Sequence, residues 1–248
     1  MAGHSMREHE VYSKLRAPPS SRLILRLDGR GFHRLTEYLE FDRPYDEAFR
    51  DLMVRTCRDL MEEFSPTLIY TFSDEINVLL DSVPFDGRVE KLDSVFSGFA
   101  SSSFTMGALE AGFSPVKPVS FDCRVIPLSD DLVPEYFRSR QDEAWRNCLN
   151  SYAYWTLRRE VGARRAARKL HGLKSDSLHD LLFERGVNIS RVPAWQRRGV
   201  GVYRVPHTVT GYNPLRDEEV SAVRMRVKVD LELPIFADEF FEGLMNRG

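Results

Sequence analysis

The sequence has few cysteines, no long apolar run, and no repeated or low-complexity tract. Its three cysteines, Cys57, Cys123 and Cys148, are far apart, which excludes a paired CxxC motif for zinc or redox chemistry and argues against a disulfide framework. No apolar stretch approaches the roughly 18 residues that a membrane-spanning helix requires, and the first residues contain no apolar signal-peptide core. These absences predict a cytoplasmic protein that makes no membrane contact.

What is present is enough for a globular protein. The 248 residues are 42% hydrophobic and 29% charged, so the chain can bury a sizeable core and is neither disordered nor fibrous. One compact unit, or two closely joined ones, fits this length.

One stretch near the N-terminus combines an apolar run with a carboxylate and two glycines. Residues 23–27 are mostly apolar and lead into Asp28, and Gly29 and Gly31 follow at a spacing of two. Positions without a side chain let the main chain approach an anion closely and present N–H groups to it. The pattern predicts a strand that ends at Asp28, followed by a loop that cradles phosphate.

A second stretch predicts a hairpin with a carboxylate in its turn. Residues 68–72 are followed by Ser73-Asp74-Glu75, and 76–80 form a second apolar run. Between the two stretches, apolar residues from Tyr45 to Phe64 recur at three- and four-residue steps, which predicts a crossover helix. Strands joined by such a helix run parallel in a shared sheet, so Asp28 and Asp74 are expected at one edge. Two carboxylates beside a phosphate-cradling loop suit two divalent ions in phosphoryl transfer. Either motif alone is equally typical of an ordinary turn.

Further along, the pattern continues as a helix and a strand. Apolar residues from Val89 to Ser103 recur at helical spacing, and apolar and polar residues alternate from Val119 to Leu128. Together these segments give the order β-α-β-β-α-β, the ferredoxin-like pattern that polymerase palms also use. The sequence therefore predicts an α+β fold with an antiparallel ferredoxin-like palm sheet. Trp145, Tyr152 and Trp155 also keep helical spacing and are expected in a core.

The last third of the chain is locally basic. Residues 158–198 contain eleven Lys or Arg against four Asp or Glu. These cations, with Trp195 beside Arg197 and Arg198, suit an RNA backbone and a stacked base, although a solvated helix face explains any single arginine equally well. Apolar and charged residues alternate over 223–233, which predicts a half-buried strand. This strand is expected to pair with residues 199–203 as a C-terminal hairpin. The basic face of the hairpin is expected to contact either RNA or a neighbouring subunit.

Several of these motifs resemble one known family. Leu-Asp-Gly-Arg-Gly-Phe-His at 27–33, Phe-Asp-Arg-Pro-Tyr-Asp at 41–46 and Tyr-Thr-Phe-Ser-Asp-Glu at 70–75 resemble the signature of the tRNA-histidine guanylyltransferase family and its template-dependent 3′–5′ polymerase relatives. Further matches are Asn147 before Trp155, Leu-Leu-Phe at 181–183, Val-Asn-Ile at 187–189, and Pro-Ala-Trp-Gln-Arg-Arg-Gly at 193–199. The resemblance extends from about residue 11 to residue 203.

The resemblance implies an enzyme that adds a nucleotide to the 5′ end of tRNA. ATP or GTP activates a 5′-monophosphate, and the 3′-hydroxyl of the incoming nucleotide then attacks it. Asp28 and Asp74 would hold two Mg²⁺ ions together with the Gly29 carbonyl, and Glu75 would support this shell as a third catalytic residue. The implied nucleotide-binding residues are Asp28, Gly29, Arg30, Gly31, Phe32, His33, Arg43, Asp46, Ser73 and Asp74. The implied tRNA-binding residues are Asn147, Arg164, Arg165, Trp195, Arg197 and Arg198.

The order of the elements and the local charge also predict how the chain is organised. A palm-like catalytic domain is expected over residues 1–134, and a helical, basic tRNA-binding part with the hairpin over 135–248. Relatives often form tetramers, so a homo-oligomer is expected.

Two departures from the family pattern leave the substrate open. Arg43 stands where the family often has lysine. The His-Ile-Asn-Asn-Leu-Tyr-Asn element of the eukaryotic enzymes corresponds to residues 145–151, which keep only Asn147 and Leu149 and resemble the archaeal and bacterial branch. Repair of 5′-truncated tRNAs is therefore an alternative to guanylyl transfer onto tRNA-histidine. A non-catalytic palm-like module that binds RNA or nucleotides is the alternative outside enzymes, and the presence of both carboxylates disfavours it.

Overall fold

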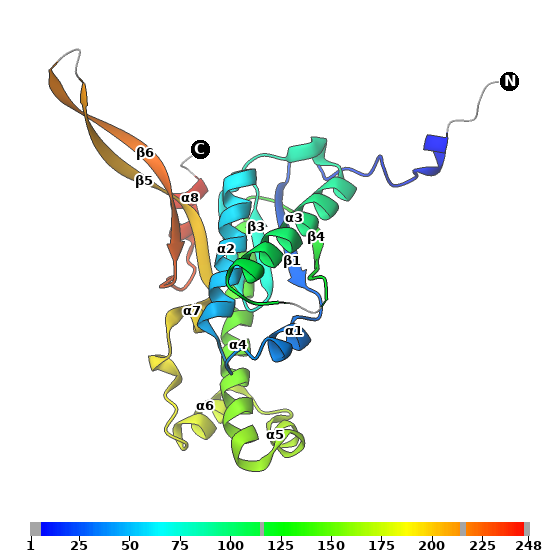
Figure 1. Cartoon of the computed structure of the whole chain (residues 1–248), viewed down its shortest axis with the longest axis vertical. Coiled ribbons are helices and arrows are strands. Elements are labelled where there is room, and N and C mark those ends of the chain that lie inside the picture. The colour runs from blue at the N-terminus through cyan, green and yellow to red at the C-terminus, as the bar shows by residue number, and fades with distance from the viewer. Residues whose placement is uncertain (1–5, 115–116, 214–216, 246–248) are drawn as a thin grey trace.

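The computed structural model describes residues 6–114, 117–213 and 217–245. These residues form a six-stranded antiparallel sheet in the order β4-β1-β3-β2-β5-β6, with helices on both faces (Figure 1). The α+β class expected from the sequence is confirmed. The strands are β1 Arg22–Gly29, β2 Leu68–Phe72, β3 Glu75–Leu79, β4 Phe121–Leu128, β5 Val200–Asn213 and β6 Glu218–Asp230.

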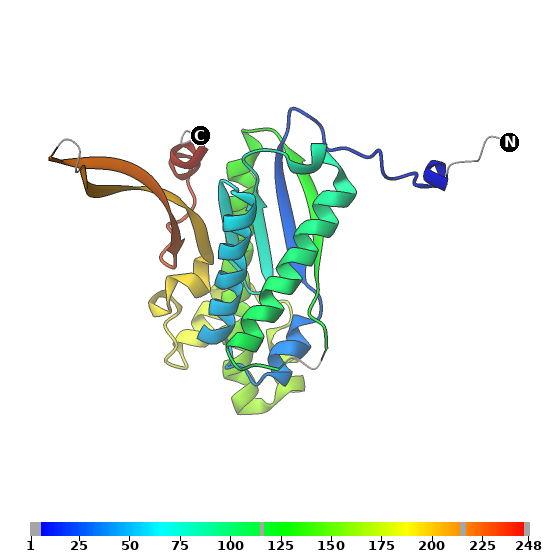
Figure 2. The same cartoon turned by 45° about the horizontal axis from the view of Figure 1, so that its top comes forward.

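Two long helices cover one face of the sheet. α2 (Glu47–Phe64) and α3 (Val89–Glu110) lie side by side against it (Figure 2). Alternate residues of β1, namely Leu23, Leu25 and Leu27, point into this layer and are buried with residues of both helices. This is the result that period-two strands and period-3.6 helices predict when they share an apolar face.

The opposite face is covered by α4 (Leu132–Val161) and the C-terminal α8 (Asp238–Met245). Tyr70, Phe137 and Phe236 pack there with their rings near perpendicular, an arrangement that aromatic rings favour. α4 has 30 residues and continues past the sheet. It spans the division expected between residues 134 and 135.

The outer half of α4 supports a small helical region with its own buried cluster, which includes Cys148, Leu149, Leu178 and Leu182. α5 lies at its far end (Figure 1). The remaining short elements are α1 Phe32–Tyr38, α5 Ala163–Leu170, α6 Ser175–Phe183, α7 Ala194–Arg198, η1 Met6–His9, η2 Pro84–Gly87 and η3 Ile189–Arg191.

The strand order β4-β1-β3-β2 is the ferredoxin-like arrangement predicted from the sequence. The predicted C-terminal hairpin is also present, because β5 pairs with β6 from Gly201 to Asn213. One feature was not predicted: β5 also pairs with β2, with Thr71 opposite Val200, so the hairpin extends the palm sheet. The outer part of the hairpin projects away from the body (Figure 1). Within the described ranges, no helix combines the length and apolarity that a bilayer crossing needs.

Candidate active site

The two predicted carboxylates, Asp28 and Asp74, meet where the inner strands β1 and β2 end. We call this place the carboxylate edge. β1 and β2 each pair antiparallel with β3 and therefore run parallel to each other. The main-chain N–H of Gly29 donates to the carbonyl oxygen of Asp74 at 3.0 Å. The sequence prediction that Asp28 and Asp74 come together is thus confirmed.

The turn that carries Asp74 is held by local hydrogen bonds. Ser73 has a φ of 50°, and its hydroxyl donates to Asp74 Oδ1 at 3.0 Å. The hydroxyl of Thr71 donates to the carbonyl oxygen of Glu75 at 2.7 Å, which closes the turn from the other side. Asp74 is therefore presented in one orientation at the end of the hairpin.

Both carboxylates of the edge have a raised pKa. Burial raises the pKa of Asp28, and the negative charges of Asp122 and Glu75 raise it further. Burial also raises the pKa of Asp74, with the charge of Asp28 adding to it, against a hydrogen bond from Ser73. Both shifts mean that the charged pair is disfavoured by itself, so a divalent cation would relieve it. The oxygen donors of two carboxylates and a nearby carbonyl suit Mg²⁺. In the described ranges, no group of three or more His, Cys, Asp or Glu side chains is arranged to hold a metal ion.

Glycine is required at positions 29 and 31 for two different structural reasons. A Cβ on Gly29 would lie 2.4 Å from the ring of Phe32, which packs against Phe104 and Phe121 in the core. Gly31 has a φ of 73°, a conformation that glycine adopts without strain. Phe32 is 2% exposed, so its side chain anchors the loop rather than projecting from it. Phe32 and His33 belong to α1, which makes the loop shorter than the sequence indicated.

A cavity of about 390 Å³ lies beside the carboxylate edge. It is bordered by α1, the connection from α1 to α2, the β2–β3 turn, α4 and α7, and its volume is within the range of small-molecule sites. Among the predicted nucleotide-binding residues, six line it: Phe32, His33, Arg43, Asp46, Ser73 and Asp74. Asn147 and Trp195 from the predicted tRNA-binding set line it as well. Arg30 is exposed and lies outside this lining.

Comparison with known proteins identifies the family. A family model described as "Thg1: tRNAHis guanylyltransferase" matches residues 3–129. The probable tRNA(His) guanylyltransferase of Dictyostelium discoideum is 30% identical over 194 residues, which cover 74% of this chain and 75% of that protein. The tRNA(His) guanylyltransferase of Saccharomyces cerevisiae is 29% identical over 200 residues, covering 75% and 84%. The chain belongs to the tRNA(His) guanylyltransferase family.

Solved structures agree with this family assignment. A bacterial tRNA(His) guanylyltransferase (Thg1)-like protein in complex with ATP has a TM-score of 0.77 and 25% identity, and the match covers 99% of this chain and 98% of that one. The tRNA(His) guanylyltransferase from Saccharomyces cerevisiae shares the fold, with a TM-score of 0.69 over 89% of this chain and 96% of that one at 24% identity. Membership of the family makes the chain a nucleotidyltransferase, as the sequence predicted.

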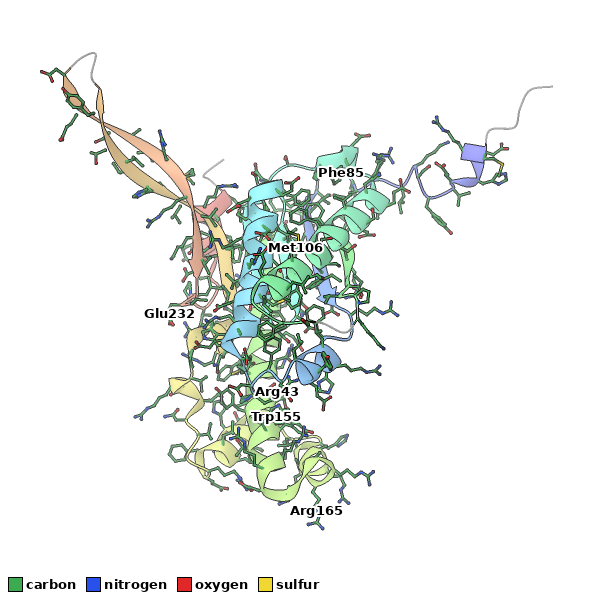
Figure 3. All side chains as sticks on the ribbon, viewed as in Figure 1. Arg43, Phe85, Met106, Trp155, Arg165 and Glu232 are labelled. Carbon is green, nitrogen blue, oxygen red and sulfur yellow. The ribbon has the colours of Figure 1, made fainter. Side chains whose placement is uncertain are left out.

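Arg43 lies beside an aromatic residue of the cavity. Its Nη2 donates to the hydroxyl of Thr36 at 2.7 Å, and its guanidinium lies 5.6 Å from the ring centroid of Trp155. Arg158 lies 4.4 Å from the same ring. Figure 3 shows Arg43 and Trp155 together where the α1–α2 connection meets α4. The expectation that Trp155 is a core residue was wrong, because it is only partly buried and lines the cavity.

Asp46 organises the main chain beside the cavity. It is the N-cap of α2, where Oδ1 accepts from the N–H of Phe49 at 2.9 Å and Oδ2 accepts from the N–H of Asp42 at 2.8 Å. A capping carboxylate of this kind stabilises a helix by about 1 kcal/mol. Its observed contacts are thus structural.

Three of the predicted tRNA-binding side chains are engaged within the fold. Trp195 stands perpendicular to the ring of Tyr45 and beneath the guanidinium of Arg50. Arg197 Nε donates to the carbonyl oxygen of Val192 at 3.0 Å, and Arg198 Nη1 to that of Leu233 at 3.1 Å. By contrast, Arg164 and Arg165 on α5 are exposed, and Arg165 extends into solvent at the outer end of the molecule (Figure 3).

Glu75 pairs with an arginine instead of lining the cavity. Arg140 of α4 donates to both carboxylate oxygens of Glu75, at 2.8 and 2.7 Å. Asn77 donates to Glu75 Oε1 at 2.8 Å. Sequence reasoning missed Arg140, because a residue 65 positions away leaves no local signal.

Proposed function

We propose that the chain extends the 5′ end of tRNA by 3′–5′ nucleotide addition, after ATP or GTP has activated a 5′-monophosphate. The observation that supports this most is the position of Asp28 and Asp74 at one edge, next to the cavity, within a fold that a bacterial ATP-bound relative shares over almost its whole length. In the first step the 5′-phosphate displaces pyrophosphate from the nucleotide. In the second step the 3′-hydroxyl of the incoming nucleotide attacks the activated phosphate, loses its proton and displaces the nucleoside monophosphate.

Asp28, Asp74 and the carbonyl of Gly29 are the groups that would hold two Mg²⁺ ions, and such ions supply charge neutralisation at the reacting phosphoryl oxygens. Ser73 fixes the orientation of Asp74 through its hydrogen bond. Arg43 brings a permanent positive charge to the cavity for phosphate groups, with a planar guanidinium in place of a compact ammonium. Trp155 offers its ring to a base or to Arg43.

The tRNA would lie along the outer half of α4 and on α5. We call this surface the basic end and define it by the exposed Arg158, Arg159, Arg164, Arg165, Arg168 and Lys169. Exposed guanidinium groups suit phosphate contacts, which give affinity without sequence selectivity. Asn147 is exposed on α4 and lines the cavity, so it lies between the basic end and the carboxylate edge. The proposal includes a cytoplasmic protein that forms a homo-tetramer.

Two substrates fit this chemistry: full-length tRNA-histidine, and tRNAs that lack their first nucleotide. The second is favoured by residues 145–151, where the eukaryotic element is largely replaced. Repair opposite a template base requires no tRNA-histidine identity element.

The test is to incubate the protein with 5′-monophosphorylated tRNAs, full-length or lacking the first nucleotide, together with Mg²⁺, ATP and each NTP. We expect growth at the 5′ end, with the added base complementary to the template position in truncated tRNAs. The matched control is Asp74→Asn, which removes one carboxylate charge and keeps the side-chain shape. Absence of 5′ growth on every tRNA, with a folded protein, would reject the proposed function.

A further inference from the structure

Glu75 is the acidic residue next to Asp74, and its contacts hold it away from the cavity. Its side chain is 13% exposed, and a guanidinium that donates to both oxygens fixes the plane of the carboxylate as well as its charge. Asn77 Nδ2 adds a third hydrogen bond. Glu75 is thus saturated by donors from α4 and from its own strand.

Arg140 is itself held in place. Its guanidinium lies 5.5 Å from the ring centroid of Phe72, and its side chain is 18% exposed. Tyr136, one turn earlier on α4, donates from its hydroxyl to Asn77 Oδ1 at 2.6 Å. Two residues on one face of α4 therefore contact two alternate residues of β3.

These contacts lie at the first residue of β3, directly after the Ser73-Asp74 turn. Glu75 is paired with Phe72 in β2 and with Asp28 in β1. The arginine thus fixes the position in the sheet at which all three strands of the carboxylate edge are joined. It also neutralises the acidic side chain that lies nearest to this edge along the strand.

We infer that Arg140 is a positioning residue for the carboxylate edge: it acts through Glu75, orienting the Asp74 turn and keeping the Glu75 carboxylate away from the cation. This inference rests on the proposed function, and it changes the role that the sequence suggested for Glu75. Glu75 belongs to the support of the edge and does not touch the reacting atoms. Without Arg140, an uncompensated and partly buried carboxylate would lie beside Asp28 and Asp74.

The variants follow from this mechanism. Arg140→Gln leaves Glu75 charged and unpaired, whereas Glu75→Gln keeps a hydrogen-bond acceptor for Arg140. Arg140→Lys keeps the charge but not the two-pronged geometry. The double variant Arg140→Gln with Glu75→Gln removes both charges, which proteins tolerate better than the loss of one partner. Arg138→Gln is the matched control, because Arg138 lies on the same helix and pairs with Asp238 at 2.6 Å at the surface.

Two readouts are needed: the first-turnover rate of nucleotide addition, and the Mg²⁺ concentration that gives half of the Mg²⁺-induced rise in Tm without tRNA. For Arg140→Gln we expect the Mg²⁺ midpoint to rise about 10- to 100-fold, the usual effect of losing support behind metal ligands, and the first-turnover rate to fall with it. Arg140→Lys should lie between this variant and the wild type, and the double variant should recover part of both quantities. Arg138→Gln should match the wild type.

An Mg²⁺ midpoint in Arg140→Gln equal to that of the wild type would overturn the inference, and so would a double variant as impaired as Arg140→Gln. A loss of several orders of magnitude in Glu75→Gln would also overturn it, because Glu75 would then act directly. The Tm readout needs no tRNA, so the inference is tested even if wild-type protein extends no tRNA and the proposed function fails.

Discussion

The carboxylate edge and the basic end differ in how the chain holds their charges. At the edge the charges are few and partly buried, and main-chain pairing of three strands fixes them. At the basic end six cationic side chains stand exposed at the end of α4 and on α5, a helix of eight residues. Chemistry on a phosphate needs groups fixed in advance, whereas contact with a nucleic-acid backbone mainly needs charge density. The proposed function therefore places these two requirements in separate parts of the structure.

α4 connects the two regions. Its first half packs on the sheet and carries Arg140 against Glu75, while its outer half carries Arg158 beside Trp155. A tRNA bound at the basic end, as proposed, would therefore lie on the same helix that supports the carboxylate edge.

The largest expected effect is at the edge. Asp28→Asn or Asp74→Asn should lower the rate of nucleotide addition by about a thousandfold or more, because each removes a carboxylate charge that would hold the cations at the reacting phosphates. The measurement is first-turnover addition at saturating tRNA, with circular dichroism to confirm the fold. Asp81→Asn is the control, since Asp81 is exposed beyond the opposite end of β3. Turnover near that of the wild type in either edge variant would remove the basis for the two-metal proposal.

The next effect concerns the basic end. Changing Arg164, Arg165, Arg168 and Lys169 together to Gln should weaken tRNA binding, and the slope of log affinity against log salt should become shallower by about 0.7–0.9 for each lost phosphate contact. ATP binding should stay the same. The matched comparison is Arg224→Gln with Arg226→Gln, two exposed arginines of β6. If that pair changed the salt slope and the α5 set did not, the RNA would lie on the hairpin.

A smaller effect tests how tightly the edge is built. Gly29→Ala should destabilise the protein by about 1–3 kcal/mol, because the new methyl group meets a phenyl ring already packed among other aromatic rings. Urea unfolding measures this difference. Gly98→Ala is the counterpart on α3, where the described neighbours leave open space for a methyl group, and it should stabilise by about 1 kcal/mol. Equal stabilities for the two variants would contradict the packing account.

The smallest effect is a pH dependence without metal. The folded protein raises the pKa of Asp74 above its ordinary value of 3.8, mainly through burial, so the folded state binds this proton more tightly than the unfolded state does. The charged form therefore destabilises the fold above the raised pKa, and this penalty disappears as the pH falls to 3.8. Asp74→Asn should have a higher Tm than the wild type at neutral pH, with a difference that shrinks on acidification. A constant difference across this range would show that the cause is not titration.

Much of the edge was predictable because its signals are local. A strand ending at Asp28, a helix of regular spacing and a hairpin around Asp74 force the two carboxylates to one edge by topology alone. The pairing of β5 with β2 was not predictable, since about 130 residues separate Thr71 from Val200 and strand pairing leaves no mark at such a distance. Trp155 was misplaced for another reason: helical spacing is the same for a core residue and for one that lines a cavity.

The C-terminal arginines show a related limit. Arg197 and Arg198 next to Trp195 were predicted to bind tRNA, and that remains a prediction. Their donation to the carbonyl oxygens of Val192 and Leu233 depends on how distant segments pack. Alanine at these positions would disturb the fold as well as any RNA contact, so the exposed α5 residues give the cleaner test.

The most direct test is whether the carboxylate edge and the basic end have separate roles. Two quantities are measured in the same two variants: the tRNA Kd, and the first-turnover rate at saturating tRNA. One variant combines Asp28→Asn with Asp74→Asn, and the other is the four-residue α5 variant. We predict a crossed result, in which the edge variant loses its rate and keeps its Kd within a few-fold, while the α5 variant loses affinity and keeps its rate. A parallel loss of rate and affinity in both variants would contradict the account.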